Sequence, residues 1–160
     1  MKDMITPNPD IEEIIATASN LAKSYNHEYV TLEHLLVALI TFKSFNKLLL
    51  DHGVNTKELT GDLCEYISVQ DHLVNLHDDM IPKKTHALER VFNRAFTQVL
   101  FSARSQIETI DLYLSITQET NSHAAYFLLK WNVYRKELIS FYNQTHQLAN
   151  PGNIKSKKSW

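Results

Sequence analysis

The sequence predicts an all-α fold of about eight helices, arranged as two pseudo-symmetric four-helix repeats packed into one globular domain. An apolar pattern with helical spacing occurs near the start and returns 77 positions later (88 − 11): Ile11, Ile14, Ile15, Ala18 and Ala22 are followed by Leu88, Val91, Phe92, Ala95 and Val99. A later segment, 49–59, returns as 128–138 at an offset of 79 (128 − 49), which places two extra residues in a loop of the second copy. Only 3 Gly and 4 Pro interrupt the 160 residues, which disfavours a protein of sheets and turns. Internal duplication of this kind is typical of a pseudo-symmetric helical domain.

The first copy, about residues 10–68, follows a lead over residues 1–9. Its expected helices cover about residues 10–25, 31–40, 45–52 and 56–68. Three of them begin at a residue whose side chain can accept a hydrogen bond from the free N–H groups of a helix start: Asp10, Thr31 and Thr56. Glu33 falls in the first turn of the second helix, where the helix dipole favours a carboxylate. Gly53 follows the third helix and suits the left-handed conformation of a C-cap.

The second copy, about residues 86–147, begins after a polar stretch at 69–85 that lacks a helical pattern. We expect this stretch to be a surface loop that links the copies. The expected helices of the second copy cover about residues 86–104, 111–118, 122–131 and 135–146. Asn132 stands where the first copy has Gly53, and Asn is the next-best residue for a left-handed cap. Residues 148–160 are basic and polar and are expected to form a flexible tail or the start of a linker.

Charge, hydrophobic run length and cysteine count indicate which partners and which compartment to expect. The net charge of −2 gives no reason to expect nucleic acid as a partner, because phosphate binding depends on clustered Lys and Arg. No segment approaches the roughly 20 consecutive apolar residues of a membrane-spanning helix, so no membrane is expected. The lone Cys64 cannot form an internal disulfide, which is compatible with a reducing compartment. We therefore expect a cytoplasmic protein.

Several side chains are expected in the core. Leu36 lies on the apolar face of the second helix, and Cys64 lies beside Leu63 on the inward side of the fourth, where we expect a small buried hydrophobe and not a nucleophile. Most aromatic residues with helical spacing are also expected inside: Phe92, Phe96, Phe101, Tyr126, Phe127, Trp131 and Tyr142. Trp131 has a second interpretation, partial exposure, since the first copy has His52 at that place.

The 8 His residues raise the question of a metal or catalytic site. The best candidates for ligands are His27 and His34, and the group His72-x-x-x-x-His77-Asp78-Asp79, but their spacings match no zinc signature. Glu28 and Glu33 have no nucleophile or pocket residue nearby in the sequence, which disfavours a catalytic acid and base pair. We expect no metal, no cofactor and no enzyme activity; metal-dependent hydrolysis abolished by changes at His72 or His77 would contradict this.

The most specific stretch is His27-Glu28-Tyr29-Val30-Thr31-Leu32-Glu33-His34-Leu35-Leu36-x-Ala38-Leu39. It resembles the His-Glu-Phe-x-Thr-x-Glu-His-Leu-Leu-x-Ala-Leu pattern in the N-terminal domain of the Clp family of ring-forming unfoldases, most closely the type found on ClpA. Two segments of the second copy are similar to that domain as well: Arg90-Val91-x-x-Arg94-Ala95 and Ala124-Ala125-Tyr126-x-Leu128-Leu129. The resemblance covers roughly residues 10–146.

This resemblance implies a function in binding. In the family, the domain is a pair of four-helix repeats that performs no chemistry and hands adaptors and substrate proteins to the ATPase ring, which unfolds them for the Clp peptidase. The adaptor ClpS docks on a face whose residues are matched here by Glu28, Glu33, Thr85 and Arg90. We expect Glu28 and Glu33 to be exposed acceptors beside a helix N-terminus, with Tyr29 as an apolar anchor and Lys84 as part of a positive edge.

If Trp131 is partly exposed, its ring is a candidate contact for unfolded or tagged substrate proteins. Nothing in the chain resembles the phosphate-binding Gly-x-x-x-x-Gly-Lys-Ser/Thr motif. Two alternatives stay open: an N-terminal part of a ClpA-type unfoldase, or a free-standing accessory or competitor protein that binds Clp adaptors or subunits without a motor. In either case we expect the isolated domain to be a monomer.

Overall fold

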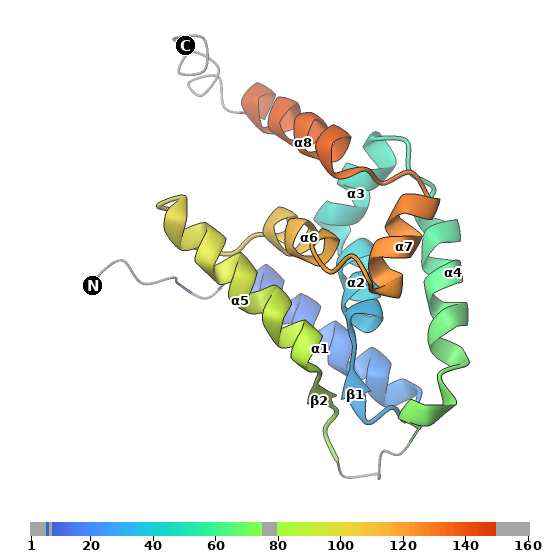
Figure 1. The fold of residues 1–160 in the computed structure, drawn as a ribbon. Helices are drawn as coiled ribbons and strands as arrows, with labels where there is room; N and C mark the ends of the chain where they lie inside the picture. Colours follow the sequence, from blue (N-terminus) through green and yellow to red (C-terminus); the bar gives the residue numbers. More distant parts are fainter. Residues whose placement is uncertain (1–5, 7, 75–79, 150–160) are drawn as a thin grey trace.

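The structure, a computed structural model, describes residue 6, residues 8–74 and residues 80–149. The all-α prediction is confirmed: these residues form eight α-helices and one short 3-10 helix, with two strands of two residues each (Figure 1). In chain order the elements are α1 (Pro9–Ser24), β1 (Tyr29–Val30), α2 (Leu32–Thr41), α3 (Lys43–Asp51), α4 (Thr56–Ser68), η1 (Asp71–Leu73), β2 (Lys83–Lys84), α5 (His86–Phe101), α6 (Thr109–Thr117), α7 (His123–Lys130) and α8 (Arg135–Ala149). Within the described residues, no helix combines the length and the apolar character that crossing a membrane requires.

The two copies correspond helix by helix. The bounds of α1 and α5 differ by 77 at both ends (86 − 9 and 101 − 24), and α2 and α6 start at the same offset (109 − 32). The starts of α4 and α8 differ by 79 (135 − 56). The extra residues lie in the connection 118–122 between α6 and α7, where the first copy has only Phe42 between α2 and α3. The predicted insertion of a loop in the second copy therefore falls between its second and third helices.

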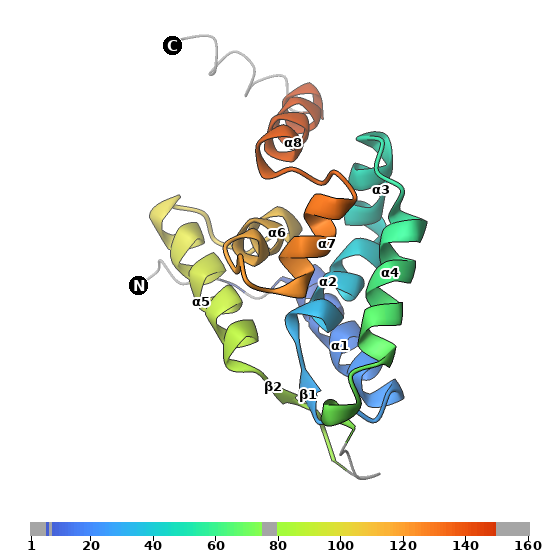
Figure 2. The same cartoon turned by 45° about the vertical axis from the view of Figure 1, so that its right-hand side comes forward.

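The core forms around α2 and its counterpart α6. Every residue from Leu32 to Ile40 in α2 is buried, and α2 contacts α1, α3, α4, α5, α6 and α7. In Figure 2, α6 lies between α5 and α7, and α2 lies among α1, α4 and α7. Leu36 is completely buried, as predicted. The short connections α2–α3 and α3–α4 keep consecutive helices of the first copy in contact.

Two helices are capped by an earlier residue than the one predicted. The side chain of Asn8 accepts a hydrogen bond from the backbone N–H of Asp10, so Asn8 and not Asp10 caps α1, with Pro9 at the first helical position. The side chain of Asn55 accepts from the backbone N–H of Glu58, so Asn55 caps α4 and Thr56 lies inside it. In both places two neighbouring residues are able to cap, and the earlier one does so.

The left-handed caps agree with the prediction. Gly53 has a φ of 91° after α3, and Asn132 has a φ of 63° after α7. The backbone N–H groups of Val54 and Val133 then bond to the carbonyls of Leu49 and Leu128, which closes both helices in the same way.

Several aromatic side chains are not in the core. Phe96 is 43% exposed, Phe101 84% and Tyr126 57%, because each lies on the outer side of α5 or α7. Phe127 is buried, whereas Phe92, Trp131 and Tyr142 are partly buried and pack against the core. Cys64 is also only partly buried, although it contacts the core cluster as expected of a small hydrophobe.

The link between the copies contains structure that the sequence did not predict. Instead of an irregular loop, the described part of 69–85 contains η1 and β2, and β2 pairs in parallel with β1. Tyr29 lies opposite Lys83, and Val30 lies opposite Lys84. A strand of two residues is too short to show an alternating pattern, so no sequence signal marks it. Residues 75–79 and the tail from 150 onward lie outside the described residues.

Candidate functional site

Four of the six predicted docking residues are brought together by the strand pair. The backbone N–H of Lys83 donates to the carbonyl of Glu28 (2.8 Å), and the N–H of Thr85 donates to the carbonyl of Val30 (3.3 Å). Glu28 and Tyr29 therefore lie beside Lys84 and Thr85, although more than 50 residues separate them in the sequence. Figure 1 shows the two strands side by side at one end of the molecule.

The strands also bring two helix starts together. Each strand leads through a threonine N-cap into a helix, β1 through Thr31 into α2 and β2 through Thr85 into α5. The hydroxyl of Thr85 accepts from the backbone N–H of Leu88 at 3.1 Å. Because the strands run in parallel, the N-termini of α2 and α5 lie next to each other. Two adjacent helix N-termini give this end of the molecule a local positive potential.

We call the surface around this strand pair the strand-pair face; it consists of Glu28, Tyr29, Lys83, Lys84 and Thr85. Lys83 and Lys84 are exposed, and the other three side chains are half-buried. The face thus presents a carboxylate, a phenol ring and a hydroxyl next to two ammonium groups. Side chains of both charges around an aromatic ring are suited to a protein partner.

Glu33 does not lie on this face. The expected exposed acceptor is wrong, because Glu33 is only 9% exposed and its Oε2 accepts a hydrogen bond from the backbone N–H of Ala124 at 2.8 Å. Ala124 lies in the first turn of α7, so the carboxylate of Glu33 satisfies a free N–H group of that helix. Glu33 therefore joins the first copy to the second.

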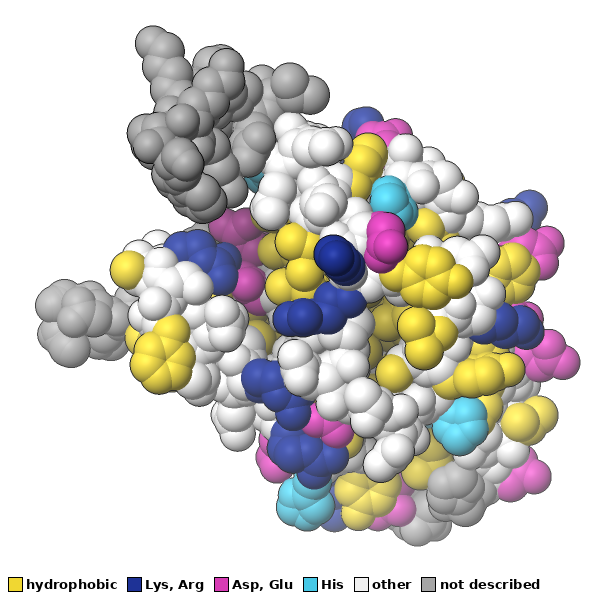
Figure 3. All heavy atoms as spheres, turned by 45° about the horizontal axis from the view of Figure 1, so that its top comes forward, with side chains coloured by type: hydrophobic (Ala, Val, Ile, Leu, Met, Phe, Trp, Pro, Cys, Tyr) yellow, Lys and Arg dark blue, Asp and Glu magenta, His cyan; other side chains and the backbone are white. Residues whose placement is uncertain are grey.

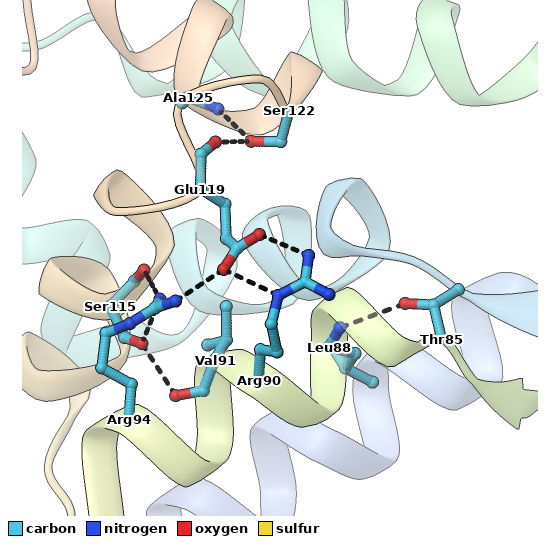
Figure 4. A network of polar contacts seen from close by, with 9 residues as sticks. All are labelled: Thr85, Leu88, Arg90, Val91, Arg94, Ser115, Glu119, Ser122 and Ala125. Carbon is cyan, nitrogen blue, oxygen red and sulfur yellow. Dashed lines mark hydrogen bonds and ion pairs between the residues drawn. The ribbon is translucent and has the colours of Figure 1, made fainter. Parts of the chain in front are cut away.

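Arg90 lies just past the first turn of α5 and is held by an acidic partner. Its Nη2 donates to Glu119 Oε1 (2.8 Å) and its Nε to Glu119 Oε2 (3.3 Å). Arg94 reaches the same carboxylate (2.7 Å) and donates through Nη1 to the carbonyl and hydroxyl of Ser115 (Figure 4). The hydrogen bonds from Arg90, with those from Arg94, hold the pKa of Glu119 below its ordinary value. Arg90 remains 58% exposed, so its outer side is accessible.

A cavity of about 260 Å³ lies behind the strand-pair face, between α2, α4 and the segment at Leu73. Glu33, Thr85 and Tyr66 line it together with two buried histidines, His27 and His34. Their rings are hydrogen-bonded, with 3.0 Å between His27 Nδ1 and His34 Nε2. Burial, and secondarily the neighbouring His27, lowers the pKa of His34 from 6.5 to about 4. His34 is therefore neutral in the folded protein at neutral pH.

The histidine candidates do not form a metal centre in the part of the chain that the structure describes. His27 and His34 come together, but among the described residues no three His, Cys, Asp or Glu side chains gather in a way that could hold an ion. The side chain of His72 and residues 77–79 lie outside the described residues.

Trp131 lies far from the strand-pair face. It ends α7, on the side of the molecule opposite the strands (Figures 1 and 2). Its indole N–H donates to Asp62 Oδ2 at 2.8 Å, and Lys130 binds the same oxygen at 2.8 Å. The ring is thus partly buried and held between α4 and α7.

Sequence reasoning missed three of the interactions that form this region. The His27–His34 pair was considered only as metal ligands, Glu119 was not considered at all, and the pairing of Lys83 with Tyr29 depends on the unpredicted strands. For the pair at His34 a signal was present: a residue three positions after the cap Thr31 is where a capping-box partner is expected.

Comparison with known proteins identifies the fold and the family. The chain matches the family described as Clp repeat (R) N-terminal domain over residues 6–131. It is 31% identical over 132 residues to a ClpA homolog protein from Fuscovulum blasticum; the match covers 82% of this chain and 17% of that relative, so the chain spans only a small part of its length.

Two solved structures share the fold at 13% sequence identity. One was described as part of preliminary structural investigations of a malarial protein secretion system, with a TM-score of 0.75 over 88% of this chain and 94% of that one. The other is the Hsp104 N-terminal domain from Candida albicans, with a TM-score of 0.68 over 86% of this chain and 88% of that one. With the duplicated four-helix architecture and the match over residues 6–131, the chain belongs to the family of Clp N-terminal domains.

Proposed function

We propose that this chain is the adaptor- and substrate-docking N-terminal domain of a ClpA-type unfoldase, which delivers proteins to the ATPase ring for unfolding and degradation by the Clp peptidase. Membership in the Clp N-terminal domain family supports a role in binding adaptors or substrate proteins without catalysis. We place the domain in the cytoplasm, in keeping with its single cysteine.

The observation that carries the proposal is the parallel pairing of β1 with β2. It brings Glu28, Tyr29, Lys84 and Thr85 from two distant segments together at one end of the molecule. Glu28 and Thr85 are two of the four positions that the family resemblance assigns to docking of a ClpS-type adaptor, and Tyr29 and Lys84 are the anchor and the positive edge that we expect beside them. Since the backbone hydrogen bonds of the strands fix the relative positions of these side chains, a partner meets a preorganised surface.

The other two positions contribute in different ways. Arg90 is fixed by Glu119, with its outer side accessible along α5 from Thr85, so it extends the strand-pair face. Glu33 is a positioning residue, because its bond to Ala124 fixes α7 against α2 behind the face. A carboxylate in this buried place cannot meet an adaptor directly.

A calorimetric titration with a ClpS-type adaptor tests the docking face. We expect the wild-type chain to bind near the micromolar level, about −8 kcal/mol. Glu28→Ala and Lys84→Glu should each weaken binding by roughly tenfold or more, because both remove a charged contact from the rim of an interface.

Two matched variants control for charge. Glu13→Ala removes an exposed carboxylate from α1, and Lys57→Glu reverses an exposed charge on α4; both should bind as the wild type does. A loss in Glu13→Ala equal to that in Glu28→Ala, together with a loss in Lys57→Glu equal to that in Lys84→Glu, would reduce the effect to net charge, and the absence of binding by the wild type would overturn adaptor docking. Circular dichroism of each variant confirms that it is folded.

Trp131 is our candidate for contact with unfolded substrate proteins, since the bond to Asp62 leaves part of its ring accessible. In a Trp160→Phe background Trp131 is the single tryptophan, because the chain contains 2 Trp. We expect its emission to shift when a tryptophan-free unfolded protein is added, and not when the same protein is added in its folded form. Unchanged emission at saturating substrate would remove Trp131 from the site.

A further inference from the structure

All four arginines of the chain belong to the second copy: Arg90, Arg94, Arg104 and Arg135. They come from α5, from the connection that follows it, and from the first residue of α8. Figure 3 shows Lys and Arg side chains gathered across the middle of this side of the molecule, with hydrophobic side chains to either side. The uneven distribution is notable because the 12 lysines (16 − 4) are spread over both copies and the ends of the chain.

Two of these arginines line a small cavity of about 110 Å³ between α5, α6 and the start of α8. We call it the arginine cup and define it by Arg94, Gln98, Gln118 and Arg135, whose side chains lie around it. Its floor is formed by apolar and small side chains of α5 and α6, including Ala95. The cup is separate from the strand-pair face, since none of its residues belongs to that face.

Several polar side chains around the cup have N–H donors that form no hydrogen bond with the described residues. Among the residues that the structure describes, the side chains of Arg135, Gln98 and Gln118 make no hydrogen bond or ion pair. Arg94 uses Nη1 for Ser115 and Nη2 for Glu119, which leaves its Nε–H and one Nη2–H without a described partner. The cup is therefore lined mainly by unused N–H donors.

The charge of the cup is positive even though a carboxylate adjoins it. Asp111 also borders the cavity, but Arg104 donates to both of its oxygens, at 2.7 and 2.9 Å. Glu119 is likewise shared by Arg90 and Arg94. Of the charged side chains that line the cavity, Arg94 and Arg135 are cationic and Asp111 is anionic, which leaves a net charge of +1 (2 − 1). Arg135 has no acidic partner among the described residues.

We propose that the arginine cup binds a single oxyanion, the phosphate or carboxylate group of a peptide chain. Guanidinium groups bind both kinds of oxyanion in a bidentate manner, and glutamine amides add further donors. The volume suits one such group, since sites for drug-sized ligands run from about 300 to 1,000 Å³. A nucleotide is therefore too large. The proposal does not depend on adaptor docking at the strand-pair face.

The first test uses inorganic phosphate and does not require a known peptide. We expect phosphate, titrated at constant ionic strength, to shift the backbone amide resonances of residues around the cup in a saturable way. Arg135→Gln should weaken this binding by about tenfold, because it removes the one guanidinium that has all its donors available. Lys136→Gln is the matched control: it removes the same charge from the next residue of α8, outside the cup, and should bind as the wild type does.

A second test identifies the source of the oxyanion. It compares one short peptide in three forms: phosphorylated with an amidated C-terminus, unphosphorylated with a free C-terminal carboxylate, and unphosphorylated with an amidated C-terminus. Binding of the first or second form, lost in Arg135→Gln and kept in Lys136→Gln, supports the proposal and names the source.

Three results would overturn it. The first is a response to phosphate that does not saturate in the wild type, and the second is an equal loss of phosphate binding in Arg135→Gln and Lys136→Gln. The third is binding of phosphate without binding of either charged peptide, which would mean that the cup holds an adventitious ion only. Arg135 is exposed, so its replacement does not disturb the core, and the thermal midpoint of each variant checks this.

Discussion

His34 donates a hydrogen bond to His27 inside the first copy, with 3.0 Å between His34 Nε2 and His27 Nδ1. The direction follows from the other ring nitrogen, because the backbone N–H of Thr31 donates to His34 Nδ1 at 2.9 Å. His34 therefore carries its single proton on Nε2. A second proton on Nδ1 would face the N–H of Thr31, so the capping box of α2 requires a neutral ring.

The second copy makes the same contact with different chemistry. The offset of 77 places Arg104 at the position of His27 and Asp111 at that of His34 (104 − 27 and 111 − 34). Arg104 donates to both oxygens of Asp111, and the carboxylate also accepts from the backbone N–H of Glu108, the cap of α6. A residue at the third helical position thus joins the cap to the preceding loop in both copies. One copy uses an ion pair, and the other uses a neutral pair that protonation breaks.

We expect the protein to become less stable as the pH falls, because of His34. Its pKa is about 4 in the folded chain and 6.5 when unperturbed, so between these values the unfolded chain binds a proton that the folded chain does not. The free energy of unfolding therefore decreases as pH falls from 6.5 to 4, by about 3 kcal/mol in total. Urea unfolding at several pH values measures this decrease.

The variant His34→Gln tests the cause. Glutamine accepts from the cap through its carbonyl and donates through its amide, but it does not titrate, so the slope between pH 6.5 and 4 should become flatter. His86→Gln is the control, because the His86 side chain is 97% exposed and its loss should keep the slope of the wild type. An unchanged slope in His34→Gln would place the pH dependence elsewhere.

The sequence predicted the helices well because their signal is local. The apolar spacing of Ile11 to Ala22 and its return 77 positions later depend only on residues within one helix, and the buried residues of α1 and α5 follow it. The helix starts were less certain, since Asn8 and Asn55 stand beside other residues that can also cap. The short strands carry no pattern of their own.

The role of Glu33 could not be read from the sequence for a different reason. Its partner, the backbone N–H of Ala124, lies 91 residues away, and only tertiary packing brings the start of α7 to this carboxylate. The pairing of Arg90 with Glu119 is also remote, at 29 residues. A motif fixes which residue types are present, but it does not state whether a carboxylate faces solvent or a helix in the other copy.

Glu33→Ala should destabilise the fold by about 1–3 kcal/mol, because it leaves the buried N–H of Ala124 without an acceptor. Glu33→Gln retains a carbonyl oxygen at this place and should lose less. Chemical denaturation compares the two variants with the wild type. If both are as stable as the wild type, the bond between the copies contributes nothing and Glu33 becomes available again as a docking residue.

Leu36→Ala should cost about 2–5 kcal/mol, since Leu36 is completely buried in the central helix α2. Leu129→Ala removes the same atoms from a side chain that is 61% exposed, and its effect should stay within about 0.5 kcal/mol. Thermal unfolding of both variants measures the difference. Similar midpoints for the two would show that the core does not lie around α2.

The pseudo-symmetry itself can be tested by placing the ion pair of the second copy into the first. His27→Arg alone buries a cation, and His34→Asp alone buries a carboxylate, so each single variant should be destabilised. In the double variant the two groups can pair as Arg104 and Asp111 do, with the neighbouring cavity of about 260 Å³ to receive the longer arginine. We expect the free energy of unfolding of the double variant to be about 1–3 kcal/mol higher than the value obtained by adding the two single losses. It should also lack the loss of stability between pH 6.5 and about 5, because neither group titrates in that range. If urea unfolding shows losses that are purely additive, the two introduced side chains do not pair. The backbones of the two copies would then correspond at this contact, but the first copy would lack the room that an arginine and an aspartate need to form the ion pair.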